Sequence, residues 1–203
     1  MGYSRAEKEK THKRIVKIAA KRFREKGLAR VGIAELMKEA GLTVGGFYKH
    51  FDSRDDLVAE AVGSALGTWK RQVDAAASGG PPLTYAKLID DYLNEVHRDD
   101  PGTGCAYSAL AAELSRSDKK TRALASEQIR NDIQLIAGLL PGKNRRAARS
   151  RAILTLSALV GAMSLARAVS DQVRSREILK TVAEVLKKSA SKKAKARPEK
   201  MFP

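Results

Sequence analysis

The segment Leu28–Leu57, LARVGIAELMKEAGLTVGGFYKHFDSRDDL, decides how the rest of the chain folds. Its first half predicts a short helix, whose apolar residues recur at helical spacing: Ile33, Leu36, Met37 and Ala40. Gly41 can take the left-handed conformation that ends a helix, and the Thr43 hydroxyl can accept a backbone N–H of the next. The second helix repeats the apolar spacing with Val44, Phe47, Tyr48 and Phe51. Two short amphipathic helices joined by a glycine-containing turn are typical of a helix-turn-helix.

Helical periodicity continues on both sides of this segment, and no stretch has the pattern of a strand. An arm over 1–7 precedes a helix over 8–26, and Ser53 caps a helix predicted over 54–77. Further helices are predicted over 83–97, 104–116, 118–139, 143–169 and 171–188. We therefore expect an all-α chain of about nine helices, divided into a three-helix helix-turn-helix domain (1–53), a helical ligand-binding and dimerisation domain (54–188) and a disordered basic tail (189–203).

Length and composition limit where such a chain can act. A chain of 203 residues with 43% hydrophobic residues can bury a sizeable core. No apolar run reaches the ~18 residues that span a bilayer, and the N-terminus lacks the apolar segment of a signal peptide. A single cysteine excludes an intramolecular disulfide framework. These features predict a cytoplasmic protein without membrane association.

Positive charge is concentrated near the two ends of the chain. The formal net charge is +16. Residues 1–54 carry 14 Lys/Arg against 6 Asp/Glu, a balance of +8, and residues 187–203 carry 7 against 1, a balance of +6. The 132 residues between them carry 18 against 16, only +2. Because one basic end contains the helix-turn-helix, this distribution indicates a polyanion partner, double-stranded DNA.

An ordered set of residues links the N-terminal part to a known family. The set comprises Ile18-Ala19, Phe23, Gly27, Ile33, Leu36, Ala40-Gly41-Leu42, Phe47-Tyr48-Lys49-His50-Phe51, Ser53-Arg54 and Leu57. With it, the first 60 residues resemble the DNA-binding domain of the TetR/AcrR family of bacterial regulators. Two later segments resemble one subgroup: Gly104-Cys105 with 111–114, and Gly161-Ala162 with 165–169. The resemblance implies a homodimer, a helix-turn-helix on each subunit, and a ligand pocket whose occupation changes the separation of the two DNA-reading heads.

The residues expected to meet DNA lie in and around the second helix. Its N-terminal residues, which face base edges in such motifs, are Thr43, Val44, Gly45 and Gly46. None can form a bidentate contact to a base, so readout rests on methyl groups and Lys49. The glycine pair either lets the backbone approach DNA or marks a loose turn. The resemblance implies phosphate contacts from Tyr48, His50 and Arg54, while Gly32 stands where the family usually has a hydroxyl and leaves bare backbone amides.

The second domain offers candidates for a ligand pocket and a dimer interface. The ligand candidates are aromatic, soft apolar or polar: Trp69, Tyr92, Tyr107, Leu110, Glu113 and Met163. Plain core packing is the alternative for each apolar one. The dimer candidates lie on the last two helices: Leu156, Val160, Met163, Arg167, Ile178, Val182 and Val185. Cys105 opens a helix, which allows a reactive thiol or a structural one.

Together these features predict a ligand-responsive transcriptional regulator, a repressor that binds a palindromic operator as a homodimer and is released by a small molecule. The alternative is a non-specific or architectural DNA-binding protein, which the basic tail suits. An enzyme is not expected, because three His and one Cys show no nucleophile–base or metal-ligand spacing. No cofactor and no metal are expected, and His50 has no second ligand at metal-binding spacing.

Overall fold

The computed structural model describes residues 4–67, 74 and 78–192, and these residues form helices without a strand. The all-α fold class, with an N-terminal helix-turn-helix and a C-terminal helical domain, is confirmed. The chain divides into two compact units. The first comprises Met1–Arg71 with Asp100–Ile129, and the second comprises Gln72–Asp99 with Arg130–Pro203. The first unit therefore includes residues beyond 53, where the sequence-based division into functional domains was drawn.

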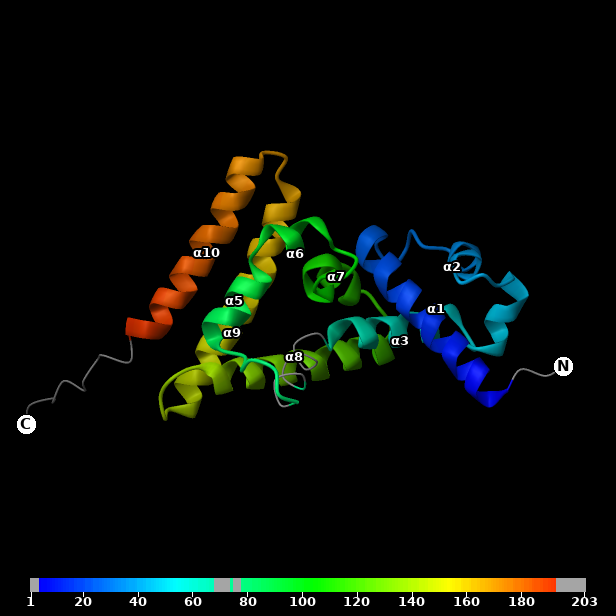
Figure 1. Ribbon diagram of the computed structural model, residues 1–203, viewed down its shortest axis with the longest axis horizontal. Coiled ribbons are helices and arrows are strands. Elements are labelled where there is room, and N and C mark those ends of the chain that lie inside the picture. Colours follow the sequence, from blue (N-terminus) through cyan, green and yellow to red (C-terminus); the bar gives the residue numbers. More distant parts are fainter. Residues whose placement is uncertain (1–3, 68–73, 75–77, 193–203) are drawn as a thin grey trace, which may run out of the picture. The chain divides into compact units, whose positions relative to one another are not determined.

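The first unit is built on the helix-turn-helix (Figure 1). It contains α1 (Arg5–Lys26), α2 (Ile33–Glu39), the 3-10 helix η1 (Val44–Lys49), α3 (Arg54–Leu66), α7 (Ala106–Leu114) and the start of α8 (Lys119–Leu139). Helix α1 packs against α2, α3 and α7. The core side chains of the first four helices are apolar and fully buried: Ile15, Ala19, Phe23, Leu36, Met37, Phe47 and Leu57. The predicted apolar face of α2 is thus its buried face.

Several helix boundaries differ from the predicted ones, and the helix predicted over 83–97 is divided into α5 and α6, which end and begin at Tyr92 and Glu95. Helix α1 begins at Arg5 because Ser4 and Glu7 form a capping box: the Glu7 amide donates to Ser4 Oγ at 3.2 Å, and the Ser4 amide donates to Glu7 Oε2 at 2.9 Å. The prediction of an irregular arm over 1–7 was therefore wrong for residues 5–7, which belong to α1. Helix α3 ends at Leu66, with Gly67 as its C-cap residue. Of the remainder of the run predicted to 77, residues 68–73 and 75–77 lie outside the described part of the chain. Helix α10 continues to Lys192, past the predicted end at 188.

Helix α7 is held on the first four helices by polar contacts between distant parts of the sequence. The Leu28 amide donates to Glu113 Oε1 at 2.7 Å, across 85 residues. The Arg24 guanidinium donates to the Gly102 carbonyl, with Nε at 2.9 Å. Gly27 has a φ of +87°, and a Cβ there would lie 3.0 Å from Glu113 Oε1. Glycine therefore provides both the helix-ending conformation and the room for the Glu113 carboxylate.

The second unit is an antiparallel pair of long helices with two shorter helices against it. It contains α5 (Tyr85–Tyr92), α6 (Glu95–Asp99), the end of α8, α9 (Arg145–Ala168) and α10 (Gln172–Lys192). Helix α9 packs against α10 and α6, and α10 packs against α5. Its core includes Leu88, Ile89, Leu159 and Met163, all without exposed surface.

Of the described helices, α9 is the one long and apolar enough to cross a membrane by length and composition.

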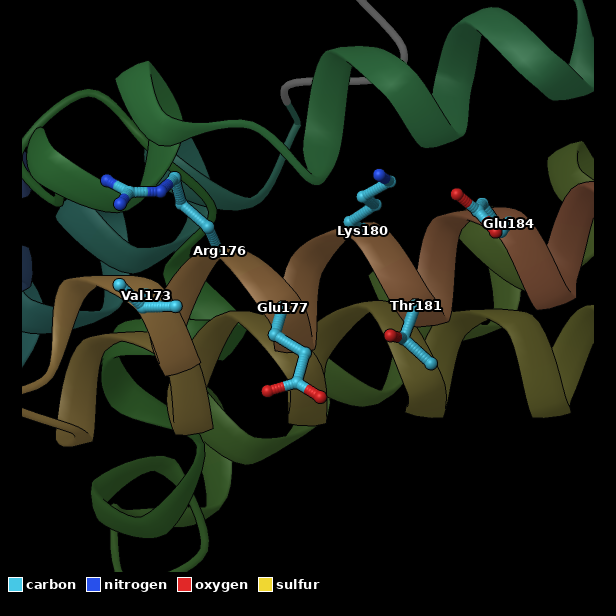
Figure 2. A pocket seen from close by; sticks show the side chains of 6 residues that line it. All are labelled: Val173, Arg176, Glu177, Lys180, Thr181 and Glu184. Carbon is cyan, nitrogen blue, oxygen red and sulfur yellow. The ribbon is translucent and has the colours of Figure 1, made fainter.

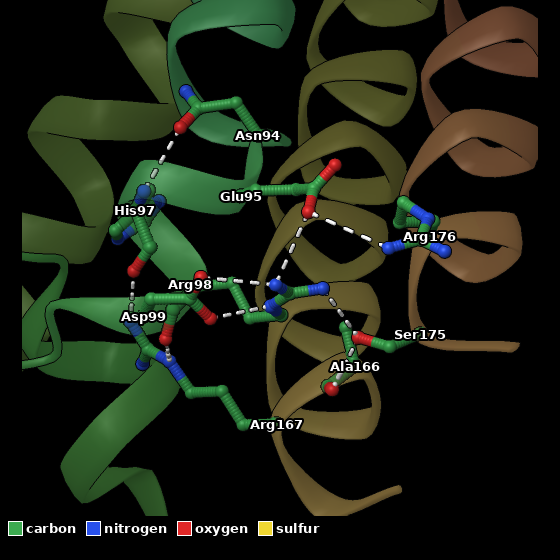
Figure 3. Close-up of polar contacts among 9 residues, drawn as sticks. All are labelled: Asn94, Glu95, His97, Arg98, Asp99, Ala166, Arg167, Ser175 and Arg176. Atoms are coloured by element: carbon green, nitrogen blue, oxygen red, sulfur yellow. Dashed lines mark hydrogen bonds and ion pairs between the residues drawn. The ribbon is translucent and has the colours of Figure 1, made fainter. Parts of the chain in front are cut away.

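A buried arginine ties α6 to the α9–α10 connection (Figure 3). Arg98 is 7% exposed and donates to Asp99 Oδ1 at 2.6 Å and to Ser175 Oγ at 3.1 Å. Ser175 Oγ in turn donates to the Ala166 carbonyl at 2.7 Å. Arg167 donates to the His97 carbonyl at 2.6 Å from the other side. The bonds to Asp99 hold the pKa of that carboxyl below its usual value and raise the pKa of Arg98.

The contact between Leu28 and Glu113 gives the first testable prediction. Replacing Glu113 with Ala leaves the half-buried Leu28 amide without this acceptor, so we expect the free energy of unfolding to fall by about 1–3 kcal/mol. Glu113→Gln keeps a carbonyl acceptor and should lose less than half of that. The exposed Glu127→Ala is the matched control. Urea denaturation measures all three, and equal losses for Glu113→Ala and Glu127→Ala would remove the proposed contact.

Candidate nucleic-acid interface

The turn between α2 and η1 has the geometry that the sequence predicts. Gly41 has a φ of +68°, in the left-handed region. The Gly41 amide donates to the Lys38 carbonyl at 3.0 Å, and the Leu42 amide donates to the Met37 carbonyl at 2.8 Å. This pair of bonds is the Schellman motif, which satisfies carbonyls left over at the end of α2. Gly41 therefore fixes the angle at which the chain enters η1.

The second helix of the motif is a 3-10 helix, where an α-helix was expected. Two adjacent glycines, Gly45 and Gly46, disfavour an α-helix of only six residues. Thr43 is the N-cap residue, but its side chain makes no capping hydrogen bond, so that expectation was wrong. The amide of Gly46 instead donates to the Thr43 carbonyl at 3.0 Å. Of the four residues at the predicted apolar spacing, Phe47 and Phe51 are buried, whereas Val44 and Tyr48 are exposed.

Helix η1 has one buried and one exposed face. Phe47 has no exposed surface and Phe51 is 3% exposed, so both are core residues. Their ring centroids lie 5.3 Å apart. Tyr48, by contrast, is 69% exposed, and Val44 is 49% exposed. The exposed face has no core function within the first unit, so it is available to a partner.

The glycine pair has no steric need within the chain to be glycine. Neither Gly45 nor Gly46 has a positive φ. A Cβ on Gly45 would meet nothing within 4 Å, and one on Gly46 would meet Met37 Cε at an ordinary 3.6 Å. Glycine therefore lowers the helix propensity at both positions, and no contact or backbone conformation within the chain requires it. This favours the interpretation that the backbone here approaches another molecule closely.

His50 lies half-buried beside the exposed face. Burial is the main cause that lowers its pKa, and the nearby His12, Lys8 and Lys49 add to the effect. At neutral pH its imidazole is therefore uncharged. Its Nδ1 is buried and has no hydrogen-bond partner within the described part of the chain. A phosphate contact from His50 would therefore be a neutral hydrogen bond.

Arg54 is engaged inside the first unit. Its guanidinium donates to the Leu28 carbonyl and, at 3.3 Å, to the Val31 carbonyl. It also lies 5.9 Å above the centroid of the Phe23 ring. These contacts connect the start of α3 to the loop between α1 and α2. Arg54 thus has a folding role that the sequence did not reveal, and its removal should affect stability as well as DNA binding.

The remaining predicted DNA-binding positions, Gly32 and Lys49, are both exposed. Gly32 is the exposed N-cap of α2 and makes no side-chain capping bond, as its lack of a hydroxyl requires. Lys49 is exposed at the end of η1. One residue missed as a structural link is His12, whose ring stacks on Phe51 at 4.6 Å and whose Nε2 lies 2.6 Å from Glu60 Oε2. Local periodicity cannot reveal a contact across 48 residues.

The predicted ligand residues divide between the two units. Tyr107, Leu110 and Glu113 belong to the first unit, Tyr92 and Met163 belong to the second, and Trp69 lies outside the described residues. The four apolar ones are buried. Glu113 lines a cleft of about 380 Å³ in the first unit, together with Leu28, Ala29, Arg54, Asp55, Val58, Arg116, Ser117 and Asp118. Cys105 is half-buried just before α7.

The predicted dimer face on α9 needs correction. Met163 has no exposed surface, Leu156 is 7% exposed, and Arg167 bonds to carbonyls of α6, so these residues serve the chain's own packing. Val160, Ile178 and Val182 are half-buried, and Val185 is 59% exposed. The sequence period located the apolar stripe of α9, but a helix that is apolar on two faces does not indicate which face is internal.

The exposed side of α10 carries a groove of about 630 Å³ (Figure 2). Figure 2 shows Val173, Glu177 and Thr181 on one side of the helix and Arg176, Lys180 and Glu184 on the other. Four of these six side chains are charged. The groove is therefore unlike the enclosed apolar pocket expected for a small hydrophobic ligand. The described residues contain no group of three or more potential metal ligands.

Comparison with known proteins bears on the same segment. Residues 15–61 match the family model described as bacterial regulatory proteins, tetR family. The chain is 24% identical to an uncharacterized HTH-type transcriptional regulator of Haemophilus influenzae, over 88% of this chain and 90% of that protein. Its fold is similar to that of a TetR-family regulator from Cytophaga hutchinsonii (TM-score 0.72, 19% identity, 93% of this chain and 98% of that chain). It is also similar to reduced Escherichia coli NemR (TM-score 0.70, 19% identity, 88% and 96%).

The two-faced recognition helix, the Schellman turn before it and the helical domain after it define a helix-turn-helix DNA-binding regulator. Residues 15–61 match the N-terminal domain of the tetR family, and most of the chain is similar to an HTH-type transcriptional regulator. Together these similarities support a TetR family transcriptional regulator.

The glycine pair gives the second prediction. Gly45→Ala and Gly46→Ala should each leave the fold intact and stabilise it by up to about 0.5–1 kcal/mol, because alanine favours the helix and both sites have room. If the backbone approaches DNA here, the same variants should lose at least about tenfold in DNA affinity. Thermal unfolding and fluorescence anisotropy with a duplex selected from a random pool measure both quantities. Higher stability with unchanged affinity would favour the loose-turn interpretation.

Proposed function

We propose that this protein is a transcriptional repressor of the cytoplasm, which binds a palindromic operator as a homodimer and releases it when a small molecule binds. The observation that carries the proposal is the division of η1 into a buried and an exposed face. Phe47 anchors the helix, with no exposed surface, and the adjacent Tyr48 is 69% exposed. A helix fixed on one side and free on the other can enter the major groove without unfolding its support.

Recognition would depend on shape and spacing more than on hydrogen bonds to bases. The exposed positions Thr43, Val44 and Gly45 offer a hydroxyl, methyl groups and bare backbone. None can make the bidentate contacts that distinguish guanine or adenine. Tyr48 and Lys49 supply phosphate contacts, which position the protein without reading sequence. Operator choice would then rest on methyl contacts, groove shape and the distance between two half-sites.

The homodimer would form through the exposed apolar faces of α9 and α10. On α9, Leu154 and Leu165 are 65% and 59% exposed, and the small residues Ala158 and Gly161 lie between them at helical spacing. On α10, Val185 is 59% exposed, with half-buried Ile178 and Val182 near it. Two copies of this helix pair can form a four-helix bundle about a two-fold axis. The small residues would allow close approach of the two α9 helices.

Effector control would pass through Glu113. Its carboxylate holds the Leu28 amide, which lies in the loop that enters α2, and it lines the cleft of about 380 Å³ in the first unit. A ligand that changed the position of α7 would withdraw this acceptor from the DNA-reading helices. The hydrogen bond between Leu28 and Glu113 would then be the link between the effector site and the DNA-reading helices. Binding of the effector and binding of DNA would change each other's affinity by the same factor. Tyr107 and Leu110 lie on α7 with Glu113.

The second candidate function, an architectural DNA-binding protein, is favoured by one observation. Residues 187–203 carry a balance of +6 outside the helix-turn-helix. Such charge binds any duplex without regard to sequence. The two functions differ in the ratio of specific to non-specific affinity, which exceeds about 10³ for a site-specific regulator.

Selection of duplexes from a random pool tests the repressor proposal. We expect enrichment of one inverted repeat, with its half-sites about one helical turn apart. Tyr48→Ala should weaken binding to that duplex at least about tenfold, since it removes a phosphate contact, and should not change the melting temperature. Val96→Ala, at another highly exposed apolar position, is the control. A selected pool without any shared sequence would support the architectural alternative instead.

Sedimentation tests the dimer separately. The double variant Leu154→Glu/Leu165→Glu places charges on the proposed α9 face, so the sedimenting mass should fall from two chains to one. Val96→Glu introduces a charge at an exposed site on α6 and should leave the mass unchanged. Circular dichroism shows whether each variant is folded. A folded double variant that stays dimeric would exclude this face of α9.

A further inference from the structure

A second strongly basic surface lies in the second unit, where α9 begins and α10 ends. Residues 143–151 read KNRRAARSR and contain five Lys/Arg and no acidic residue. The sequence has no Asp or Glu between Asp132 and Asp171. The Arg151 guanidinium donates to the Ser189 carbonyl at 3.3 Å, which places the end of α10 beside the start of α9. We call the side chains of Lys143, Arg145, Arg146, Arg149, Arg151, Lys187 and Lys188 the α9–α10 basic surface.

The charges of this surface are available to an external partner. Lys143, Arg145, Arg146 and Arg149 are exposed or half-exposed and have no ion pair among the described residues. The two lysines of α10 differ, because Lys187 lies 2.6 Å from Asp90 Oδ1 and Lys188 lies 3.4 Å from Glu184 Oε2. Asp90 and Glu184 thus form ion pairs with the two lysines of α10. Lys143, Arg145, Arg146 and Arg149 therefore have no described acidic partner that offsets their charge.

The position of these arginines works against folding of the helix. The first turn of α9 has no acidic residue and carries Arg145 and Arg146 at the positive end of the helix dipole. Arg145 and Arg149 are four residues apart, so like charges repel on one face of the helix. Generic solubility would be served equally well by mixed charges, or by acidic residues, which favour this helix end. A residue choice that opposes local stability indicates a function outside the fold.

The amount of charge is close to that of the DNA-reading segment. The α9–α10 basic surface has seven Lys/Arg side chains, against the net +8 of residues 1–54. The two basic regions belong to different compact units. The α9–α10 basic surface therefore does not include the recognition helix.

We propose that the α9–α10 basic surface binds the phosphate backbone of a second DNA duplex, without sequence preference. Arginine is suited to phosphate because its guanidinium donates two parallel hydrogen bonds. Successive exposed arginines on the first two turns of a helix can follow the closely spaced charges of a duplex. The surface lacks aromatic side chains for base stacking among 143–151 and 187–190, which favours duplex DNA over single-stranded nucleic acid. A chain that also holds an operator would join two DNA segments.

Salt titration of binding to a duplex without operator sequence tests the proposal. The variant Arg145→Gln/Arg146→Gln/Arg149→Gln should reduce the slope of log Kobs against log salt by about one per arginine, and affinity at low salt should fall at least about tenfold. Lys119→Gln/Arg122→Gln/Arg174→Gln is the matched control. It removes the same charge at three exposed positions without a described ion pair, and its slope should change by less than about one. The first variant should melt no lower than the wild type, because it relieves repulsion at the start of α9.

Repeating the titration with Tyr48→Ala/Lys49→Ala separates this surface from the helix-turn-helix. The three α9 substitutions should reduce the affinity for duplex DNA in the Tyr48→Ala/Lys49→Ala variant as well, whether or not an operator exists. An unchanged slope in the α9 variant, or equal losses in the α9 and control variants, overturns the proposal. Stronger binding of single-stranded RNA than of the duplex also overturns it. So does a loss confined to phosphatidylglycerol vesicles, which would assign the surface to a membrane.

Discussion

Burial of the Phe47 and Phe51 rings is the interaction on which the DNA-reading surface depends, since η1 is too short to be stable alone. Full burial of each ring contributes about 1.5–3 kcal/mol, and the contact between the two rings at 5.3 Å connects η1 to the residues that follow it. His12 stacks on Phe51 and reaches Glu60, so α1 and α3 both hold the end of η1. This anchoring leaves Tyr48 outside, where a phosphate can reach it.

Polar contacts also join the helix-turn-helix to the helices that follow it in the first unit. Arg54 connects α3 to the Leu28 carbonyl, and Glu113 of α7 holds the amide of the same residue. Lys120, at the start of α8, pairs with Asp56 at 2.6 Å and lowers the pKa of that carboxyl. The loop around Leu28 is therefore held from two directions. A regulator needs such a link, because an effector can act on DNA only through groups whose contacts differ between two states.

The local parts of this fold could be predicted from the sequence. The period of 3.6 residues predicted most of the helices and the buried face of α2, and Gly41 predicted the turn. The 3-10 form of η1 was missed because propensity at two adjacent glycines competes with packing at Phe47. Contacts across long separations, such as Leu28 with Glu113, leave no periodic signal. Two of the α9 residues predicted at a dimer interface, Leu156 and Met163, are buried in the chain's own core, because both faces of that helix are apolar and periodicity does not indicate which one the fold buries.

The central claim is that the exposed face of η1 meets DNA while its other face stays in the core. Hydrogen–deuterium exchange of backbone amides, with and without a selected duplex, tests it most directly. The account predicts slower exchange over residues 43–50 when the duplex binds, because the backbone at Gly45 and Gly46 approaches the DNA. Protection confined to 143–151 and 187–192, with residues 43–50 unchanged, would contradict it.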